Sequence, residues 1–280
     1  LITRLSYDET PTKPVKTWGR DNIASNGAGP TLFQRRNGVL EDVHTFSPTM
    51  LATFRFSFTR LANQRRPYSD GFDLTTIGLP AGLAPQIGLQ VLPAVNVTGF
   101  GALGHTGVIR LGNDSYAFQA QLTKSVTRHT LKSGFEYRVI RMNNQQNGGA
   151  NPGFSFGNNW TQGPNPNQAS ANAGFALASF LLGVGGGAVS PAAAIAQQNT
   201  YYALFLQDDY KATPKLTLNL GLRYDYESPR TDRFNQLTNF DYAVRPPLDA
   251  PGLNLRGALS FVGVNGGSRF QGNADRNNLG

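Results

Sequence analysis

The segment Leu216–Glu227, LTLNLGLRYDYE, alternates strictly between two kinds of residue. Leucines and then tyrosines occupy the even positions, whereas polar residues and one glycine occupy the odd positions. Because successive side chains of a β-strand point to opposite faces, this period of two predicts a strand with one apolar and one polar face. The leucines could cover a soluble core. Alternatively, they could face lipid, with the tyrosines at the headgroup level and the polar side chains lining a lumen.

Similar alternation recurs along the chain and predicts three hairpins with short connections. Their strands pair Leu32–Phe46 with Met50–Leu61, Ser115–Val126 with Leu131–Arg141, and Thr200–Lys211 with Leu216–Glu227. A strand at Leu1–Tyr7 precedes them, and Leu259–Val264 is a further candidate. We therefore expect seven strands, with a possible eighth at Leu259–Val264.

Long connections separate these hairpins, and they are rich in Gly, Asn, Pro and Gln. They cover Ala62–Asp114, Met142–Asn199 and the chain from Ser228 onwards, with a further loop ending near Thr31. Compact soluble domains rarely contain structureless loops beyond about 12–15 residues. Short turns that alternate with long loops are typical of outer-membrane barrels, so the loop lengths favour lipid as the surroundings of the leucines.

The composition of the 280 residues fits a strand-built membrane protein better than a helical one. Only 39% are hydrophobic, and the mean hydropathy is −0.32. The chain has no cysteine, which excludes disulfides, thiolate metal sites and cysteine nucleophiles. Its net charge of +8 could serve anionic lipid, acidic ligands or nucleic acid, but the basic residues are not concentrated beyond pairs such as Arg65-Arg66. We therefore expect no nucleic-acid partner.

A transmembrane helix is the competing structure for the region without charged residues between Arg141 and Asp208. Ala173–Ala196 is long enough to span a bilayer. However, the glycines between Gly183 and Gly187 interrupt it, and Pro191 follows. We expect instead a short helix at about Ala169–Leu182 within an extracellular loop.

The charged residues of the third hairpin permit two interpretations. Asp208-Asp209, or Asp225 with Glu227, could form a general acid/base pair, which requires fixed neighbouring carboxylates. Asp209, however, lies near the short turn and Glu227 near the far end, so they should not meet. We expect these charges to pair across strands and keep a lumen wet. We expect no catalytic residue, no metal ligand among the scattered histidines, and no cofactor.

The segment Tyr201–Asp241, which contains LQDDYKATPKLTLNLGLRYDYESP, resembles the TonB-dependent outer-membrane receptors. It is most similar to the Oar-like group, which contains a carboxypeptidase-regulatory-like domain. His44–Arg60, Arg128–Arg138 and Phe175–Gly183 resemble other parts of the same barrels. The similarity covers most of the chain, but its motifs belong to strands and turns and do not identify a ligand.

The resemblance implies an all-β fold, an antiparallel transmembrane β-barrel segment with short periplasmic turns and long extracellular loops. It implies that residues 1–280 supply about seven or eight strands of a barrel of roughly 22 strands. The plug and the remaining strands would be absent and both ends truncated. The partners would be outer-membrane lipid, the plug domain of the full-length chain, the TonB complex through the missing N-terminal part, and an unidentified ligand. The location would be the outer membrane of a Gram-negative bacterium.

Two other classes stay open, namely a porin-like channel or adhesin without TonB coupling, and a soluble all-β binding module. In the transporter, extracellular loops would capture a ligand that passes through a plug-gated lumen without covalent chemistry.

The alternation and the resemblance together assign four sets of residues. The lumen-facing set, which would meet the plug or the ligand path, is Gln119, Gln121, Glu136, Arg138, Gln207, Asp209, Asn219, Arg223, Asp225 and Glu227. The lipid-facing set is Phe54, Phe56, Phe58, Phe118, Leu122, Phe135, Leu204, Leu206, Leu216, Leu218, Leu220 and Leu222. The interface aromatics are Tyr224 and Tyr226, and the ligand candidates in the loops are Phe154, Phe156 and Trp160.

Overall fold

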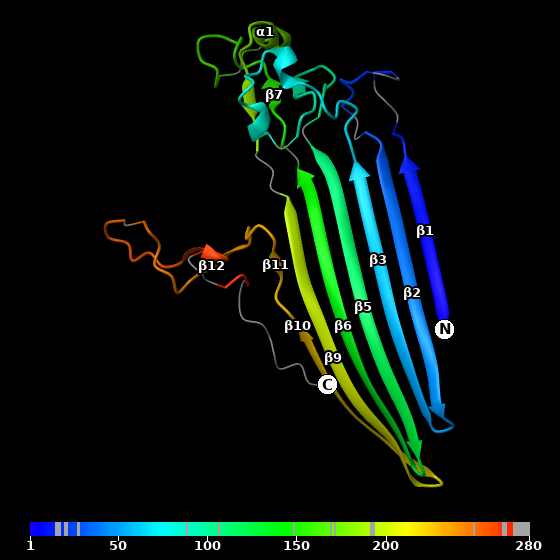
Figure 1. The fold of residues 1–280 in the computed structure, drawn as a ribbon. Helices are drawn as coiled ribbons and strands as arrows, with labels where there is room; N and C mark the ends of the chain where they lie inside the picture. The colour runs from blue at the N-terminus through cyan, green and yellow to red at the C-terminus, as the bar shows by residue number, and fades with distance from the viewer. Residues whose placement is uncertain are drawn as a thin grey trace.

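A long, curved antiparallel sheet dominates the computed structural model of this chain (Figure 1). The structure describes residues 1–14, 18–19, 22–26, 29–87, 89–105, 107–147, 149–168, 170, 172–190, 194–248, 250–264 and 268–270. The long strands of the sheet are β1 (Ile2–Thr12), β2 (Thr31–Ser47), β3 (Met50–Arg65), β5 (Val108–Val126), β6 (His129–Asn147), β9 (Ile195–Thr213) and β10 (Leu216–Glu227). They lie side by side in that order, and the short strand β11 (Thr231–Asp232) also pairs with β9.

The three predicted hairpins are confirmed. β2 pairs with β3, β5 with β6, and β9 with β10, all antiparallel. The strands extend further toward the long connections than predicted, for example through Asn143 and Asn144 of β6, which pair with β9. Asparagine and glutamine carry no apolar alternation, so the sequence pattern fades where the hydrogen-bonded ladder continues.

The sheet is open in the described part of the chain, with β1 and β10 as its outermost long strands. β1 confirms the strand predicted at Leu1–Tyr7 and runs five residues further. A strand is present at the further candidate Leu259–Val264, as β13 (Ala258–Phe261), but it does not join the main sheet. It pairs with β12 (Thr238–Asp241) in a separate two-stranded sheet. The partner lies in the same connection, and Gly263 ends the segment with a left-handed φ of 69°.

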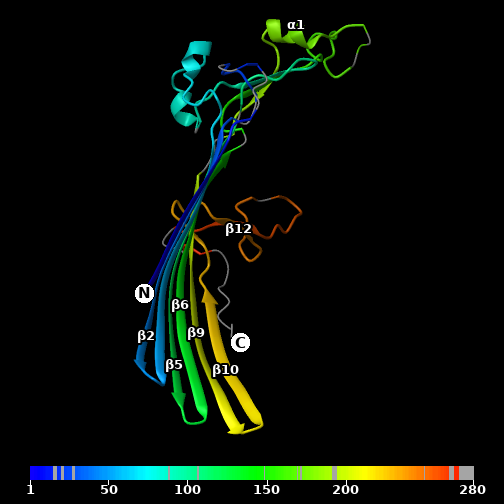
Figure 2. The ribbon, with the colours of Figure 1, turned by 90° about the vertical axis from the view of Figure 1, so that its right-hand side faces the viewer.

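The short turns lie at one end of the sheet, and β12 lies beside the sheet between its two ends (Figures 1 and 2). The long connections that join β1 to β2, β3 to β5 and β6 to β9 gather at the other end. They contain a small sheet of β4 (Ala94–Val97), β7 (Gly153–Phe156) and β8 (Gly186–Ala188), in which β4 and β7 are parallel. Two short 3₁₀ helices, η1 (Leu74–Ile77) and η2 (Ala84–Gln86), and one α-helix complete this end. Leu89, Val91, Val108 and Ala150 form its buried core.

The predicted loop helix is present but shorter, as α1 (Ala176–Leu181). Residues 169 and 171, in the predicted first turn, lie outside the described residues. Among the residues that the structure describes, no helix is both long and apolar enough to cross a membrane.

One face of the main sheet is apolar and uncovered. Paired residues of antiparallel strands point to the same face, so the register can be followed across the sheet. It runs from Phe56 to Phe118, Tyr137, Tyr202 and Tyr226. Leu220 and Leu222 are 61% and 62% exposed, which is incompatible with a soluble core over this face.

Candidate functional site

The polar face of the sheet collects every residue of the predicted lumen-facing set. The register pairs Gln119 with Glu136 across β5 and β6, and Asp209 with Asn219 across β9 and β10. The predicted lipid-facing residues lie on the opposite face by the same register. Within that set, Leu216 lies beyond a register shift and pairs with Thr213. The two interface aromatics, Tyr224 and Tyr226, share the apolar face with the leucines.

Charges on the polar face pair between neighbouring strands, as the sequence predicts. Lys132 Nζ of β6 lies 2.9 Å from Asp209 Oδ2 of β9. The second carboxylate oxygen of Asp209 accepts a hydrogen bond of 2.9 Å from Gln207. Arg55 of β3 pairs in the same way with Glu41 of β2. Such pairs give the charged groups hydrogen-bond partners while leaving them accessible to water.

Other pairs on this face form between residues two apart on one strand. Arg223 Nε lies 2.9 Å from Asp225 Oδ2, and Arg223 Nη2 donates to the Tyr201 hydroxyl at 3.0 Å. The Tyr201 hydroxyl in turn donates to Asp225. Glu136 and Arg138 form an equivalent pair on β6. Asp209 and Glu227 do not meet, because the register pairs Glu227 with Tyr201, far along β9 from Asp209.

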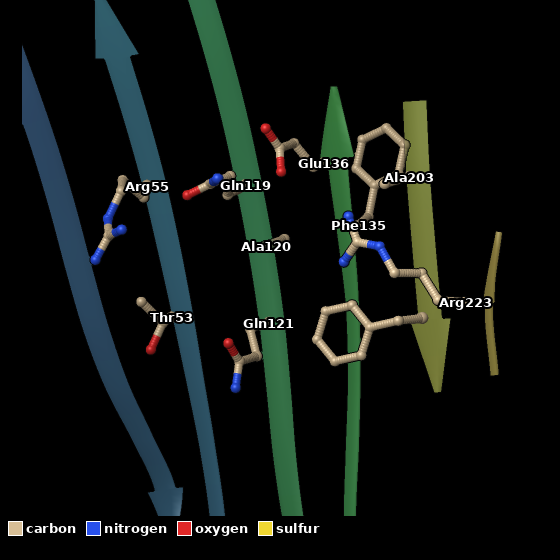
Figure 3. A pocket seen from close by; sticks show the side chains of 10 residues that line it. Thr53, Arg55, Gln119, Ala120, Gln121, Phe135, Glu136, Ala203 and Arg223 are labelled. Atoms are coloured by element: carbon tan, nitrogen blue, oxygen red, sulfur yellow. The ribbon is translucent and has the colours of Figure 1, made fainter. Parts of the chain in front are cut away.

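A shallow hollow of about 180 Å³ lies in the middle of the polar face (Figure 3). Arg55, Gln119, Gln121 and Glu136 line it, and Arg223 reaches toward it from β10. These side chains supply hydrogen-bond donors and acceptors, and they include both positive and negative groups. The arrangement therefore offers a wetted, hydrogen-bonding surface. Among the described residues no group of three or more His, Cys, Asp or Glu side chains could hold a metal ion.

Some residues of this surface are absent from the predicted set. Arg55 and Lys132 alternate with apolar neighbours, so the sequence contains the signal for their facing. Glu41 lies beside Val39 and Val43 on the same face, and only the strand register identifies it as the partner of Arg55. Phe205 is an aromatic exception on the polar face, where it pairs with Gly134.

The apolar face also has a polar exception, close to the short turns. Asp208 points to this face, and its Oδ2 lies 2.6 Å from His129 Nδ1. The His129 ring stacks on Tyr210 at 4.5 Å between centroids. A hydrogen-bonded polar pair beside an aromatic ring is compatible with the border of an apolar band rather than with its centre.

The loop residues predicted as ligand contacts are partly brought together. Phe156 and Trp160 line a hollow of about 550 Å³ with Asn96, Phe100 and Asn159. Trp160 is exposed, and the Phe156 ring packs edge-on against Phe180 of α1 at 5.1 Å. Phe154 is not among the residues that line this hollow, and it lies against Gly187 of β8.

An antiparallel sheet with an uncovered apolar face, a charge-paired polar face and all long connections at one end defines a strand-built membrane protein. The sequence matches the family model described as outer membrane beta barrel domain over residues 1–280, and the chain belongs to this family. The protein therefore resides in the bacterial outer membrane. A comparison with curated protein sequences gave no significant match.

Proposed function

We propose that this chain forms part of the barrel of a TonB-dependent transporter of the Oar-like group. The observation that carries the proposal is the division of the sheet. The apolar face is exposed for lipid, whereas the opposite face contains paired charges and a hollow that charged, polar and aromatic side chains line together. A polar interior of this kind suits a lumen that meets a plug or a passing ligand.

The unpaired edges of the sheet support the same proposal. Among the residues that the structure describes, β1 pairs only with β2, and β10 pairs only with β9. The short β11 pairs with β9 beyond the end of β10. Hydrocarbon does not tolerate unpaired backbone groups, so both edges would pair with further strands of a closed barrel. Barrels of roughly 22 strands hold a plugged lumen, which is the architecture that the resemblance of Tyr201–Asp241 implies.

Ligand capture would take place in the loops at the opposite end from the short turns. The hollow beside Phe156 and Trp160 combines aromatic rings with asparagine side chains and backbone. Pockets with aromatic walls and a few polar groups are typical of small-ligand sites. Transport would require no cofactor and no covalent chemistry, because the energy would come from the TonB complex acting on the plug.

Binding to TonB tests this function directly. The full-length protein, in detergent, is titrated with the isolated periplasmic domain of TonB from the same bacterium. We expect saturable binding that is lost when the segment preceding the barrel is deleted. Absence of binding would contradict TonB coupling.

Conductance separates the transporter from a porin-like channel. In planar bilayers the full-length transporter should be closed, because a plug fills its lumen, and should open when low concentrations of urea release the plug. A barrel that conducts steadily without urea would instead support the porin-like alternative.

A further inference from the structure

A row of arginines crosses the apolar face of the sheet on the side of the long loops. The register joins Arg36 of β2 to Arg60 of β3, Asp114 of β5 and Arg141 of β6. We call Arg36, Arg60 and Arg141, together with Asp114 between them, the arginine row. It lies on the same face as the exposed leucines and phenylalanines, because its members have the same parity along each strand.

Aromatic side chains lie immediately beside the arginine row, on the side of the apolar band. Phe58 and Tyr116 form the next pair along β3 and β5 on this face, with ring centroids 5.1 Å apart. Tyr137 and Tyr202 lie one position further from the row on β6 and β9, beyond Val139, with centroids 5.0 Å apart. Aromatic girdles of this kind mark the level of the lipid headgroups. The arginine row thus lies at the outer border of the apolar band.

The positive charge of the row is only partly neutralised. Arg60 Nη1 donates to both carboxylate oxygens of Asp114, at 3.0 and 3.2 Å. The Glu9 carboxylate on the same face interacts electrostatically with Arg36, but neither Arg36 nor Arg141 forms an ion pair with any residue that the structure describes. Each guanidinium instead lies over a tyrosine ring, Arg36 over Tyr7 at 5.6 Å and Arg141 over Tyr116 at 5.7 Å.

Two further arginines widen the positive surface near Arg141. Arg233 and Arg269 line a hollow of about 480 Å³ together with Arg141, Asn143 and Gln198. Arg141 is oriented there by donating from Nε to Gln198 Oε1 at 3.0 Å. Arg269 is held by the backbone carbonyl of Asp232, which accepts from its Nη2 at 2.8 Å. Of the described residues that line this hollow, only Asp114 is acidic, and it is already paired with Arg60.

We infer that the arginine row and the adjoining hollow bind the phosphate groups of an outer-leaflet lipid headgroup. Guanidinium groups match phosphate oxygens in a bidentate arrangement. Basic residues at a membrane surface attract anionic lipid. The arginines of the row lie at the level where the acyl chains of the lipid end and the headgroups begin. The lipid would rest its chains on Phe56 and Phe118 and its phosphates on Arg36 and Arg141. This inference holds for any outer-membrane barrel with this sheet, whether or not it transports a ligand.

Titration with diphosphorylated lipid A in mixed micelles tests the inference on the full-length protein. We expect saturable binding that weakens about 5-fold in Arg36→Gln and in Arg141→Gln, and about 25-fold in the double variant. Arg4→Gln is the matched control, since Arg4 pairs with Val39 in register and points to the opposite face. This control removes the same charge and should bind like the unmodified protein. Dephosphorylated lipid A should bind no better than the double variant.

Three results would overturn the inference. Equal weakening in Arg4→Gln would indicate net charge rather than a site, and equal binding of dephosphorylated lipid A would exclude the phosphate. Competition by inorganic phosphate at matched concentrations would indicate a site for free anions instead of lipid. Arg36→Lys and Arg141→Lys keep the charge and protect the test against misfolding of the glutamine variants. The affinities of these lysine variants for lipid A should lie between that of the unmodified protein and those of the glutamine variants. An affinity equal to that of the unmodified protein would contradict bidentate recognition.

Discussion

At the scale of single residues, Gly134 illustrates how a position on the polar face can depend on the absence of a side chain. Gly134 pairs with Phe205 across β6 and β9, and a Cβ at Gly134 would lie 2.2 Å from Phe205 Cε1. We expect Gly134→Val to destabilise the barrel by about 1–3 kcal/mol through overpacking. Gly221→Ala is the control, because its Cβ would meet nothing closer than 3.7 Å. Urea unfolding in lipid vesicles compares the two, and equal midpoints would contradict the packing of Phe205 on Gly134.

A second prediction at this scale concerns the facing of β10. Leu220 is exposed on the apolar face, whereas its neighbour Asn219 points to the polar face. We expect Leu220→Arg to destabilise the inserted protein by about 2–4 kcal/mol, as charges do at the lipid midplane. Asn219→Arg should be tolerated, because the new charge would enter a polar surface. A lipid-refolding titration measures both, and equal losses would show that the assigned faces are wrong.

At the scale of elements, the connections at the loop end depend on a buried asparagine and a half-buried histidine. Asn151 is fully buried, and its Nδ2 donates to the carbonyls of Val91 at 2.8 Å and His105 at 3.3 Å. These bonds join the connection before β5 to the connection after β6. Burial lowers the pKa of His105, and the neighbouring charge of Arg65 acts in the same direction.

Acid should therefore destabilise the packing of the connections around Asn151 and His105. A histidine with a lowered pKa in the folded state stabilises the fold above its ordinary pKa, about 6.5. That stabilisation is lost as the pH falls through the lower, folded value, because the folded state must then take up a proton. We expect hydrogen exchange at Val91 and Ala150 to accelerate between pH 7 and pH 5, after correction for intrinsic rates. His105→Asn retains an acceptor for the Gly107 amide without titrating, so its corrected exchange should not change over this range. An identical acid response in that variant would exclude His105 as the cause.

The elements also show how far the sequence predicts this fold. The alternation in Leu216–Glu227 predicts a strand and the division of its faces, because facing within a strand is a local property. The pairing of β4 with β7 joins Val95 to Phe154 across two separate connections. No periodicity in either segment indicates it, since such pairing depends on contacts distant in the chain. The same holds for Arg36 and Arg141, which only the register of the intervening strands brings into one row.

At the scale of the whole molecule, the uneven lengths of the connections determine how the sheet should lie across the membrane. The connections that join β1 to β2, β3 to β5 and β6 to β9 at one end are long, and those at the other end are short turns such as Pro214–Lys215 between β9 and β10 (Figure 1). Outer-membrane barrels place short turns in the periplasm and long loops outside the cell. The hollow beside Trp160 and the arginine row would then both lie toward the outer leaflet.

Cysteine labelling tests this orientation, because the sequence contains no cysteine of its own. Trp160 is 51% exposed in the loops, and Lys215 lies in a short turn. We expect a membrane-impermeant maleimide to label Trp160→Cys on intact cells. Lys215→Cys should react only after the outer membrane is permeabilised. The reverse pattern would place the long loops in the periplasm, and the arginine row would then meet the inner leaflet, which would contradict both ligand capture from outside and recognition of an outer-leaflet phosphate.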